Sequence, residues 1–504
     1  MGTPGESSPG DLSQVQRLRQ ENLQALGIGV TVPTYPREWL KPAIVHIGVG
    51  GFHRAHQAVY LDTLAERRIS QDWGVCGVGL LPADKRMEQA LLPQQGLYTV
   101  VERSAEAETA RVVGALTRYL FAPEHGQEVL DLLAHPHTRI VSLTITEGGY
   151  GYDQVTGEFD LSTPGVQEDL ADPLAPRTVF GYIREALRRR RQAGLPPFSV
   201  LSCDNLQGNG ALAKKMFTAF ARLRDHDLAA WIEENVAFPN CMVDRITPQT
   251  TDEDRARVAR LLGVADAWPV MTEPFTQWIV EDTFSAGRPP LEEVGVQFVP
   301  DVHPYEAMKL RLLNASHQAL AYLGYLCGYR LVHEVMADPR FPVYLARMMD
   351  EEVTPLLAPV PGVDLTLYKY TLIERFANPK IADQVLRLCQ DASARMPKFL
   401  LPSIAEALAA GRPCRLLTLA VASWFRFLSG VDEQGNPIPI DDQLAAVLRS
   451  LAQEGKDDPR PLLGVGSLFG DLSRRPRFVA ELSEALRLLY AKGASATLSH
   501  YLAS

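Results

Sequence analysis

The first 300 residues alternate short β-branched runs with segments of helical spacing, and this alternation constrains the fold more than any other feature. Four apolar runs predict buried strands, at residues 43–49, 73–80, 139–146 and 198–203. The segments with helical spacing between them are residues 54–66, 127–134 and 178–192. A chain that alternates strand and helix in this order forms a parallel sheet that helices cover on both faces.

The pattern changes near residue 304, after which convincing strands are nearly absent. Leucine-rich segments of helical spacing follow one another, at residues 305–326, 342–357, 381–395, 416–427 and 477–490. We therefore expect an α/β domain over residues 31–300 and a mostly α-helical domain over residues 301–504. Residues 1–30 are expected to be a disordered or extended lead-in.

Composition excludes several classes of protein. The net charge of -10 predicts no general attraction to nucleic acid or to acidic membranes, and no apolar run reaches the roughly 18 residues of a membrane span. The six cysteines include no CxxC pair, and the N-terminus has no signal-peptide pattern, which together indicate a reduced, cytoplasmic protein. Arg188 to Arg191 end a predicted helix, and we expect a solvated basic turn there.

A glycine-rich turn follows the first predicted strand. Gly48, Gly50 and Gly51 permit a tight turn and let backbone amides approach a pyrophosphate at the start of a helix. The turn departs from the usual GxGxxG pattern because Arg54 replaces the third glycine. Its position at the first strand of an alternating pattern predicts a Rossmann-type dinucleotide site.

Asp84 lies shortly after the second predicted strand. An acidic residue there holds the adenosine ribose of NAD, although Asp84 lies further along the chain than the usual spacing. A helix N-cap is the alternative role for this aspartate. Lys85 and Arg86 follow it directly and leave NADP open as a second cofactor.

Residues 305–317 carry a group of polar side chains suited to catalysis. On an α-helix at about 100° per residue, Glu306, Lys309, Asn314 and His317 fall at about 60°, 0°, 140° and 80°. A lysine in a water-poor pocket serves as the base in alcohol oxidation, and an asparagine amide donates to the developing alkoxide. The alternative is a polar stripe that faces water.

Asn205 follows the fourth predicted strand, where an α/β sheet presents its ligand crevice, although Asp204 and Asn205 together also suit an ordinary turn. His53 and His56 are three residues apart, but no third ligand of matching spacing accompanies them, so we predict no metal site.

Together these segments resemble the polyol-specific long-chain dehydrogenase/reductase family. The likeness runs from about residue 30 to the C-terminus, in order. Its blocks are GVGGFHRAHQ (48–57), SLTITEGGY (142–150), SCDNLQGNG (202–210), FPNCMVDRITP (238–248), TEPFTQWIVED (272–282), KLRLLNASH (309–317) and APVPGVDLTLYKYTLIERFANPKIADQ (358–384).

The resemblance implies catalytic roles residue by residue. Lys309 matches a general base that needs no zinc, and Asn205 and Asn314 match the pair that stabilises the alkoxide. His317 matches the residue that positions the reacting hydroxyl. Glu306 matches the carboxylate that helps the proton to leave the base for solvent.

Binding roles follow from the same resemblance. Val243 and Asp244 match the part of the VDR motif that touches the polyol. The resemblance also implies a contact between Val243 and the cofactor. Arg387 and Arg395 match contacts to distal hydroxyls, with Arg395 in place of an expected lysine. The implied cofactor residues are Gly48, Gly50, Gly51, Phe52, Arg54, Asp84 and Val243.

The implied reaction interconverts D-mannitol and D-fructose with NAD, without a metal, in a monomeric enzyme. Two alternatives stay open. Uronate oxidoreductases of the same family act on fructuronate, tagaturonate, mannonate or altronate, and Arg387 or Arg395 would serve as a clamp for the carboxylate. The other alternative is a non-catalytic NAD-binding sensor, which has no need of a base at Lys309.

Overall fold

The computed structural model describes residues 16–27, 29–153 and 156–503, and it divides into two compact units, Met1–Val302 and His303–Ser504. Residues 1–15 and 28 of the predicted lead-in lie outside this part. The rest of the lead-in is not disordered, because Gln20–Ala25 form a 3-10 helix and Leu18 and Leu23 are buried in a core cluster. Those two leucines lie against strands and a helix that follow far along the chain.

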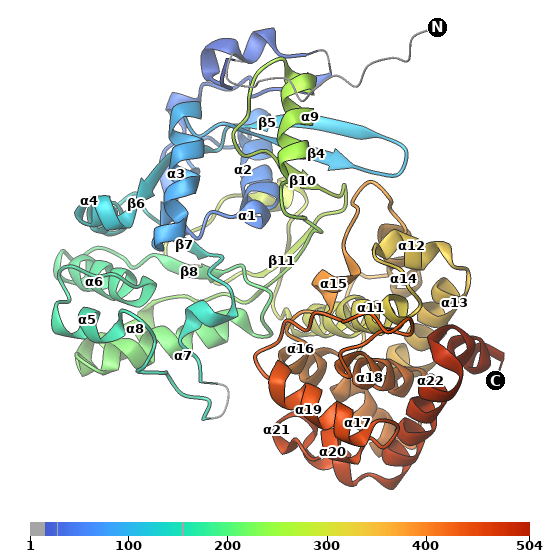
Figure 1. Ribbon diagram of the computed structural model, residues 1–504. Coiled ribbons are helices and arrows are strands. Elements are labelled where there is room, and N and C mark those ends of the chain that lie inside the picture. Colours follow the sequence, from blue (N-terminus) through green and yellow to red (C-terminus); the bar gives the residue numbers. More distant parts are fainter. Residues whose placement is uncertain (1–15, 28, 154–155, 504) are drawn as a thin grey trace, which may run out of the picture. The chain divides into compact units, whose positions relative to one another are not determined.

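The first unit is built on a parallel sheet of five strands in the order β6-β3-β2-β7-β8 (Figure 1). Its strands are β2 (Pro42–Ile47), β3 (Gly74–Gly79), β6 (Leu116–Phe121), β7 (Ile140–Leu143) and β8 (Ser199–Ser202). The four predicted strands correspond to β2, β3, β7 and β8, so the predicted α/β class with a parallel sheet is confirmed. The edge strand β6 was not predicted.

Alternate residues of these strands enter two different cores, as the period of two in a strand requires. Val45, Val141 and Val200 pack with helices α4, α6, α7 and α8 on one face of the sheet. Ile44 and Ile140 pack on the other face, with α1, α2 and α3 and with strands of two smaller sheets. The sheet is therefore covered on both faces, as predicted.

The smaller sheets complete the first unit. One has the order β1-β5-β4-β10, and the other the order β12-β11-β9, with antiparallel pairing of β4 with β5 and of β9 with β11. Their strands are β1 (Val30–Thr31), β4 (Tyr98–Arg103), β5 (Glu108–Val113), β9 (Cys241–Asp244), β10 (Val270–Thr272), β11 (Gln277–Glu281) and β12 (Gln297–Val299).

The helices of the first unit follow the strands that they cover. They are α1 (Gly51–Ala55), α2 (Gln57–Glu66), α3 (Lys85–Leu91), α4 (Ala122–Ala134), α5 (Val166–Ala171), α6 (Val179–Gln192), α7 (Asn209–Arg222), α8 (His226–Asn235) and α9 (Asp252–Leu262). Residues 54–66 were predicted as one helix but belong to two, because the chain leaves helical geometry at His56 (φ -120°, ψ -89°).

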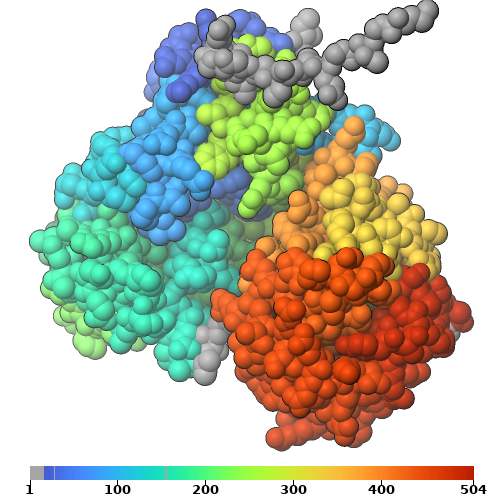
Figure 2. Space-filling model, viewed as in Figure 1, coloured from blue at the N-terminus to red at the C-terminus, as the bar shows by residue number. Residues whose placement is uncertain are grey.

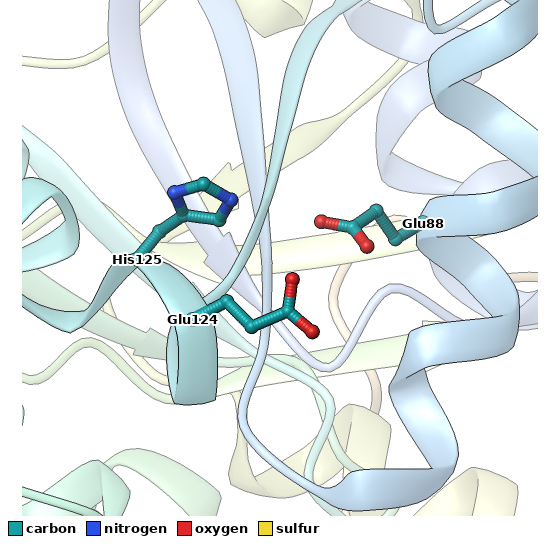
Figure 3. Close-up of side chains that lie close together, drawn as sticks. All are labelled: Glu88, Glu124 and His125. Carbon is teal, nitrogen blue, oxygen red and sulfur yellow. The ribbon is translucent and has the colours of Figure 1, made fainter.

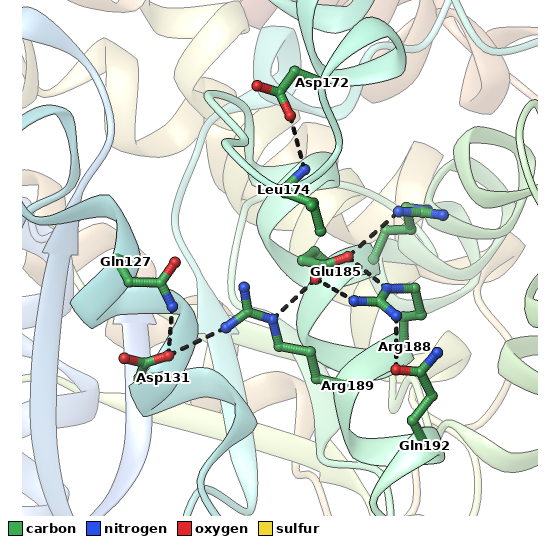
Figure 4. A network of polar contacts seen from close by, with 9 residues as sticks. Gln127, Asp131, Asp172, Leu174, Glu185, Arg188, Arg189 and Gln192 are labelled. Carbon is green, nitrogen blue, oxygen red and sulfur yellow. Dashed lines mark hydrogen bonds and ion pairs between the residues drawn. The ribbon is translucent and has the colours of Figure 1, made fainter.

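The basic turn at the end of α6 differs from its prediction. The helix ends at Gln192 as expected, but Arg188 and Arg189 turn back onto Glu185, which is fully buried (Figure 4). Arg188 Nη2 lies 2.7 Å and Arg189 Nε 2.9 Å from Glu185 Oε1. A buried carboxylate requires cationic partners, and these arginines supply them.

Arg190 is also buried, so the expectation of a solvated basic face is wrong at this residue. Its Nε donates to Pro196 O at 2.8 Å and its Nη1 to His135 O at 2.6 Å, while its guanidinium lies over the Phe198 ring. The side chain thus satisfies carbonyl groups that the loops around α6 leave inside the protein.

The second unit is helical, and its described residues form only isolated β-bridges, Leu331 with Gln384 and Val431 with Pro437. All residues of α11 are buried, and this helix packs against α15 and α18. Figure 2 shows the later helices, in orange and red, forming most of the visible surface of this unit. The helices are α10 (His303–Met308), α11 (Ala315–Leu326), α12 (Val332–Ala337), α13 (Arg340–Arg347), α14 (Leu365–Phe376), α15 (Val385–Leu388), α16 (Ala392–Phe399), α17 (Leu401–Ala409), α18 (Arg415–Leu428), α19 (Ala445–Gly455), α20 (Arg460–Leu463), α21 (Gly466–Phe469) and α22 (Pro476–Ala503).

Two segments of this unit are π-helical: η8 (Lys309–Asn314) and η9 (Met348–Val353). Residues 381–395, predicted as one helix, instead form α15 and the start of α16, because Asp391 adopts a left-handed conformation (φ 49°) between them. Within the part of the chain that the structure describes, no helix combines the length and apolar character needed to cross a bilayer.

Candidate active site

The glycine-rich turn joins β2 to α1 in the first unit. Gly48 has a φ of 93°, and a Cβ there would lie 2.2 Å from Thr144 O, so only glycine fits. Gly50 is the N-cap of α1, and no side chain caps the first turn, which Gly51 and Phe52 begin. This geometry brings backbone amides to the end of the strand without side chains in the way, as a pyrophosphate site requires.

Arg54, which replaces the third glycine of the motif, is buried and braces the turn from inside. Its Nε donates to Gly50 O at 3.2 Å, and its Nη1 donates to Trp268 O. The guanidinium also lies 5.2 Å from the centroid of the Tyr98 ring, and Tyr98 donates to Arg54 O. The described contacts of Arg54 are thus structural, and its cofactor contact stays a prediction.

Three histidines lie beneath the turn. His46 hydrogen-bonds Ser142 Oγ at 2.8 Å and Thr144 Oγ1 at 2.9 Å, and its ring stacks on His53 at 3.5 Å. Burial lowers the pKa of His46 to about 3, so the ring is neutral. The ring nitrogens of His56 already contact Gln277 O and Gln57 Nε2, and the absence of a metal at His53 and His56 stays a prediction.

Asp84 ends the short 3-10 helix Pro82–Asp84 that follows β3. Its Oδ2 accepts a hydrogen bond from Leu81 N at 2.9 Å, which is a capping role one turn back along the chain. A Cβ at Gly79 would lie 2.5 Å from Asp84 Cβ, so the glycine lets the aspartate approach the strand end. The side chain therefore lies just beyond the C-terminal end of β3, and its contact with the ribose stays a prediction.

Asn205 follows β8 and is exposed, while the preceding Asp204 organises the loops around it. The Asp204 carboxylate accepts from Ile145 N and Thr146 N at 2.9 Å each and from the Tyr150 hydroxyl at 2.7 Å. Burial raises its pKa, while these hydrogen bonds oppose the rise. Sequence reasoning missed this role, although Asp204 directly precedes a residue that it singled out.

Val243 and Asp244 are buried at the end of β9, where they pair with Trp278 and Gln277 of β11. The next residue, Arg245, was not predicted to matter but holds the segment in place. Its guanidinium donates to Glu273 O at 3.0 Å, to Ala55 O at 2.5 Å and to Glu102 Oε1 at 2.5 Å. The VDR motif itself was the signal that could have identified it.

In the second unit, one continuous helical segment carries Glu306, Lys309, Asn314 and His317, and all four are buried. The alternative of a polar stripe facing water is therefore wrong. The α-helical angles do not hold across η8, which begins at Lys309 and ends at Asn314, because π-helical hydrogen bonds reach one residue further. His303 Nδ1 lies 3.8 Å from Glu306 Oε2, and the His317 ring lies 4.2 Å from that of Phe376.

Arg387 and Arg395 lie near each other on α15 and α16 of the same unit. Arg387 Nε donates to Asp383 Oδ1 at 2.6 Å, and its Nη2 pairs with the other oxygen of that carboxylate. Arg395 Nη1 lies 3.4 Å from Arg387 O and 3.3 Å from Leu388 O. The charge of Arg387 is therefore already balanced inside the chain.

One group of possible metal-ligating atoms occurs among the described residues, formed by Glu88, Glu124 and His125 (Figure 3). Lys85 Nζ lies 2.6 Å from Glu88 Oε2 and 2.6 Å from Glu124 Oε2. An ammonium group thus already bridges the two carboxylates, and the expectation that the chain uses no metal stays a prediction.

The predicted residues therefore form two groups, one in each unit. Comparison with known proteins covers both units. Residues 42–293 match the family model of the mannitol dehydrogenase Rossmann domain, and residues 301–490 match that of the mannitol dehydrogenase C-terminal domain.

Curated relatives and solved structures agree with these matches. The chain is 52% identical to mannitol 2-dehydrogenase of Phaeosphaeria nodorum (96% of this chain, 85% of that protein) and 50% identical to that of Aspergillus fumigatus (96% and 99%). The structure of Pseudomonas fluorescens mannitol 2-dehydrogenase with NAD and D-mannitol matches with a TM-score of 0.89 and 47% identity (97% of this chain, all of that chain). A D-sorbitol dehydrogenase in substrate-free form matches with a TM-score of 0.88 and 38% identity (96% of this chain, all of that chain). The chain belongs to the mannitol dehydrogenase family.

Proposed function

We propose that the chain is an NAD-dependent oxidoreductase that interconverts D-mannitol and D-fructose. The observation that carries this proposal is the 47% identity, over 97% of the chain, to an enzyme whose structure contains NAD and D-mannitol. The burial of Glu306, Lys309, Asn314 and His317 on one helical segment supports it independently, because a sensor without chemistry has no need to bury a lysine with these partners.

The residues of the glycine-rich turn and Asp84 would hold NAD⁺, which would supply the hydride acceptor for C2 of the polyol. Lys309 takes the proton of the C2 hydroxyl, and His317, whose ring packs on Phe376, holds that hydroxyl in place. The amides of Asn205 and Asn314 donate to the oxygen as negative charge develops on it. Glu306 then passes the proton from Lys309 toward solvent, and in fructose reduction the same groups act in reverse.

The residues around the glycine turn fit the cofactor. Gly48 allows the chain to turn tightly past Thr144 O. No side chain caps the first turn of α1, so the backbone amides beside Gly50, Gly51 and Phe52 can bind a pyrophosphate. We assign the adenosine ribose to Asp84, and we assign to Arg54 the part of holding the turn in shape. Val243 and Asp244 complete the proposed site, with Asp244 contacting the polyol.

The pairing of Arg387 with Asp383 favours a neutral polyol over a hexonate. A substrate carboxylate would have to compete with Asp383 for the guanidinium of Arg387. The described contacts of Arg395 are to the carbonyl oxygens of Arg387 and Leu388, so Arg395 would be the cation left for a hexonate. Distal hydroxyls, in contrast, can hydrogen-bond to an arginine that is already paired.

The test is NADH formation with D-mannitol, D-arabinitol, D-sorbitol and D-mannonate, each repeated with NADP⁺. We expect D-mannitol with NAD⁺ to be turned over fastest and D-sorbitol to be a slower substrate, given the match to a D-sorbitol dehydrogenase. Turnover of D-mannonate alone would assign the chain to the uronate branch, and no turnover with any substrate would favour a sensor.

We further expect the enzyme to act as a monomer in the cytoplasm. Light scattering of the purified chain tests whether it is a monomer, and a mass of two or more times 55.7 kDa would contradict this expectation.

A further inference from the structure

Lys85 follows the proposed ribose-binding residue directly, so a lysine stands next to the place where NADP carries its 2′-phosphate. Adjacent Cα atoms are about 3.8 Å apart, and a lysine side chain is long enough to reach a phosphate from that position. By position alone, Lys85 therefore ought to help the chain accept NADP.

In the structure, Lys85 contacts two carboxylates instead. Its Nζ lies 2.6 Å from Glu88 Oε2 on α3 and 2.6 Å from Glu124 Oε2 on α4, and 5.0 Å from the Phe121 ring centroid. Figure 3 shows the carboxylate groups of Glu88 and Glu124 turned toward each other. The hydrogen bonds to Glu124 and Glu88 raise the pKa of Lys85, so it stays charged and paired.

Charge at this end of the sheet therefore disfavours a 2′-phosphate. Lys85 carries one positive charge against the two negative charges of Glu88 and Glu124, and Asp84 adds a third negative charge. A 2′-phosphate adds a charge of about −1.5 to −2 to these negative charges, and the exposed Arg86 offsets part of the sum.

We propose that Glu124, by holding Lys85 together with Glu88, is a specificity-determining residue that makes the enzyme select NAD over NADP. This inference rests on the proposed function, because it takes the ribose to lie at Asp84. Glu124 lies on α4, distant in sequence from the turn after β3, and it acts through the lysine rather than by touching the cofactor.

The test compares Glu124→Gln with a matched control, Glu233→Gln. Glu124 is half exposed and pairs with Lys85, while Glu233 is equally exposed in the same unit and pairs with Arg222 at 3.1 Å. Both variants remove one charge from the surface of the first unit. Dissociation constants for NAD⁺, NADP⁺ and adenosine 2′-monophosphate are measured by calorimetry, together with KM for both cofactors.

In Glu124→Gln we expect NADP⁺ and adenosine 2′-monophosphate to bind about tenfold more tightly, because a lysine that is held by Glu88 alone can turn to make one charge-assisted contact to phosphate. NAD⁺ binding should stay within about twofold, since NAD lacks that phosphate. Glu233→Gln should change neither constant. The double variant Lys85→Ala/Glu124→Gln should lose the gain for NADP⁺.

An unchanged ratio of the dissociation constants for NADP⁺ and NAD⁺ in Glu124→Gln would overturn the inference. An equal gain in NADP⁺ affinity in Glu233→Gln, or a gain that persists in the double variant without Lys85, would overturn it as well. NADH formation from D-mannitol by the unmodified chain is measured separately. Its absence would refute the proposed function, while the binding constants would still decide the role of Glu124.

Discussion

At the scale of single residues, function depends on side chains that the chain buries in spite of their polarity. Lys309 and Glu306 are buried on one helical segment, and Asp204 is buried beside the exposed Asn205. Burying such groups costs free energy unless partners are present, so we infer that each of these side chains has a structural or chemical role. The partners of Asp204 are two backbone amides and a tyrosine hydroxyl. The role that we propose for Lys309 is proton transfer.

Replacing Lys309 by alanine should lower kcat for D-mannitol oxidation by about 10²- to 10⁴-fold, the usual contribution of a general base. Binding of NAD⁺ should not change, because Lys309 is not assigned to the cofactor. Steady-state kinetics with calorimetry measure both quantities, and Lys492→Ala, an exposed lysine of the same unit, is the control. Unchanged turnover in Lys309→Ala would remove the proposed base.

Residues in contiguous motifs could be singled out from the sequence, whereas supporting residues could not. Gly48 lies in a recognisable turn, and the structure shows why no other residue fits there. Arg190 was predicted to be a solvated charge and Arg245 was given no role, because a sequence does not show which carbonyl groups the folded chain leaves inside. Their contacts come from segments up to 190 positions away.

At the scale of elements, the predictable strands were those buried on both faces. The apolar runs that became β2, β3, β7 and β8 are nearly continuous, as parallel strands that are buried on both faces require, and this holds for β8 although it lies at an edge of the sheet. The edge strand β6 carries Thr117 and Arg118 on its more open positions, and this breaks the apolar pattern. The π-helical segment η8 has no sequence signature that separates it from an α-helix.

The contact between η9 and α18 predicts a pH dependence of stability. The Glu352 carboxylate accepts from Leu416 N at 2.9 Å and Leu417 N at 2.8 Å at the start of α18. Burial, with the nearby charges of Glu481 and Glu351, raises its pKa from 4.5 to about 7. The folded chain then holds this proton more tightly than the unfolded chain does.

Stability should therefore fall as pH rises from about 4.5 to about 7, by up to about 3 kcal/mol from this group. Glu352→Gln cannot ionise, so its free energy of unfolding should not show this decrease. Between about pH 4.5 and pH 7 the variant should therefore become more stable relative to the unmodified chain. Urea unfolding at a series of pH values measures the difference, with the exposed Glu454→Gln as control. Parallel pH curves for Glu352→Gln and the unmodified chain would contradict the assignment.

At the scale of the whole molecule, the chain combines a nucleotide-binding unit with a helical unit that carries the proposed base. Each unit has its own buried core. The alternation of strand and helix, and its end near residue 304, predicted the two classes of architecture. What the alternation did not reveal is the pair of smaller sheets. Their strands β9 to β12 are only three to five residues long, and β4 and β5 pair antiparallel with no helix between them.

Removing metal ions should leave activity unchanged. The proposed proton acceptor is an amine, and the one group of three potential ligands in the described chain already holds the ammonium of Lys85. The measurement is NADH formation from D-mannitol before and after exhaustive dialysis against a chelator, with metal content determined in parallel. Activity that is lost and then restored by zinc would contradict this expectation.

The π-helical segment has a consequence for chain length. A π turn takes up one residue more than an α turn, and η8 places this extra residue between Lys309 and His317. Removing one residue from Lys309–Asn314 would take out the residue that the π turn accommodates and restore α-helical geometry, so the side chains inside the segment would change direction relative to Lys309. Length therefore matters here for a reason separate from chemistry: between these two residues we expect the enzyme to accept an exchanged side chain more readily than a lost position.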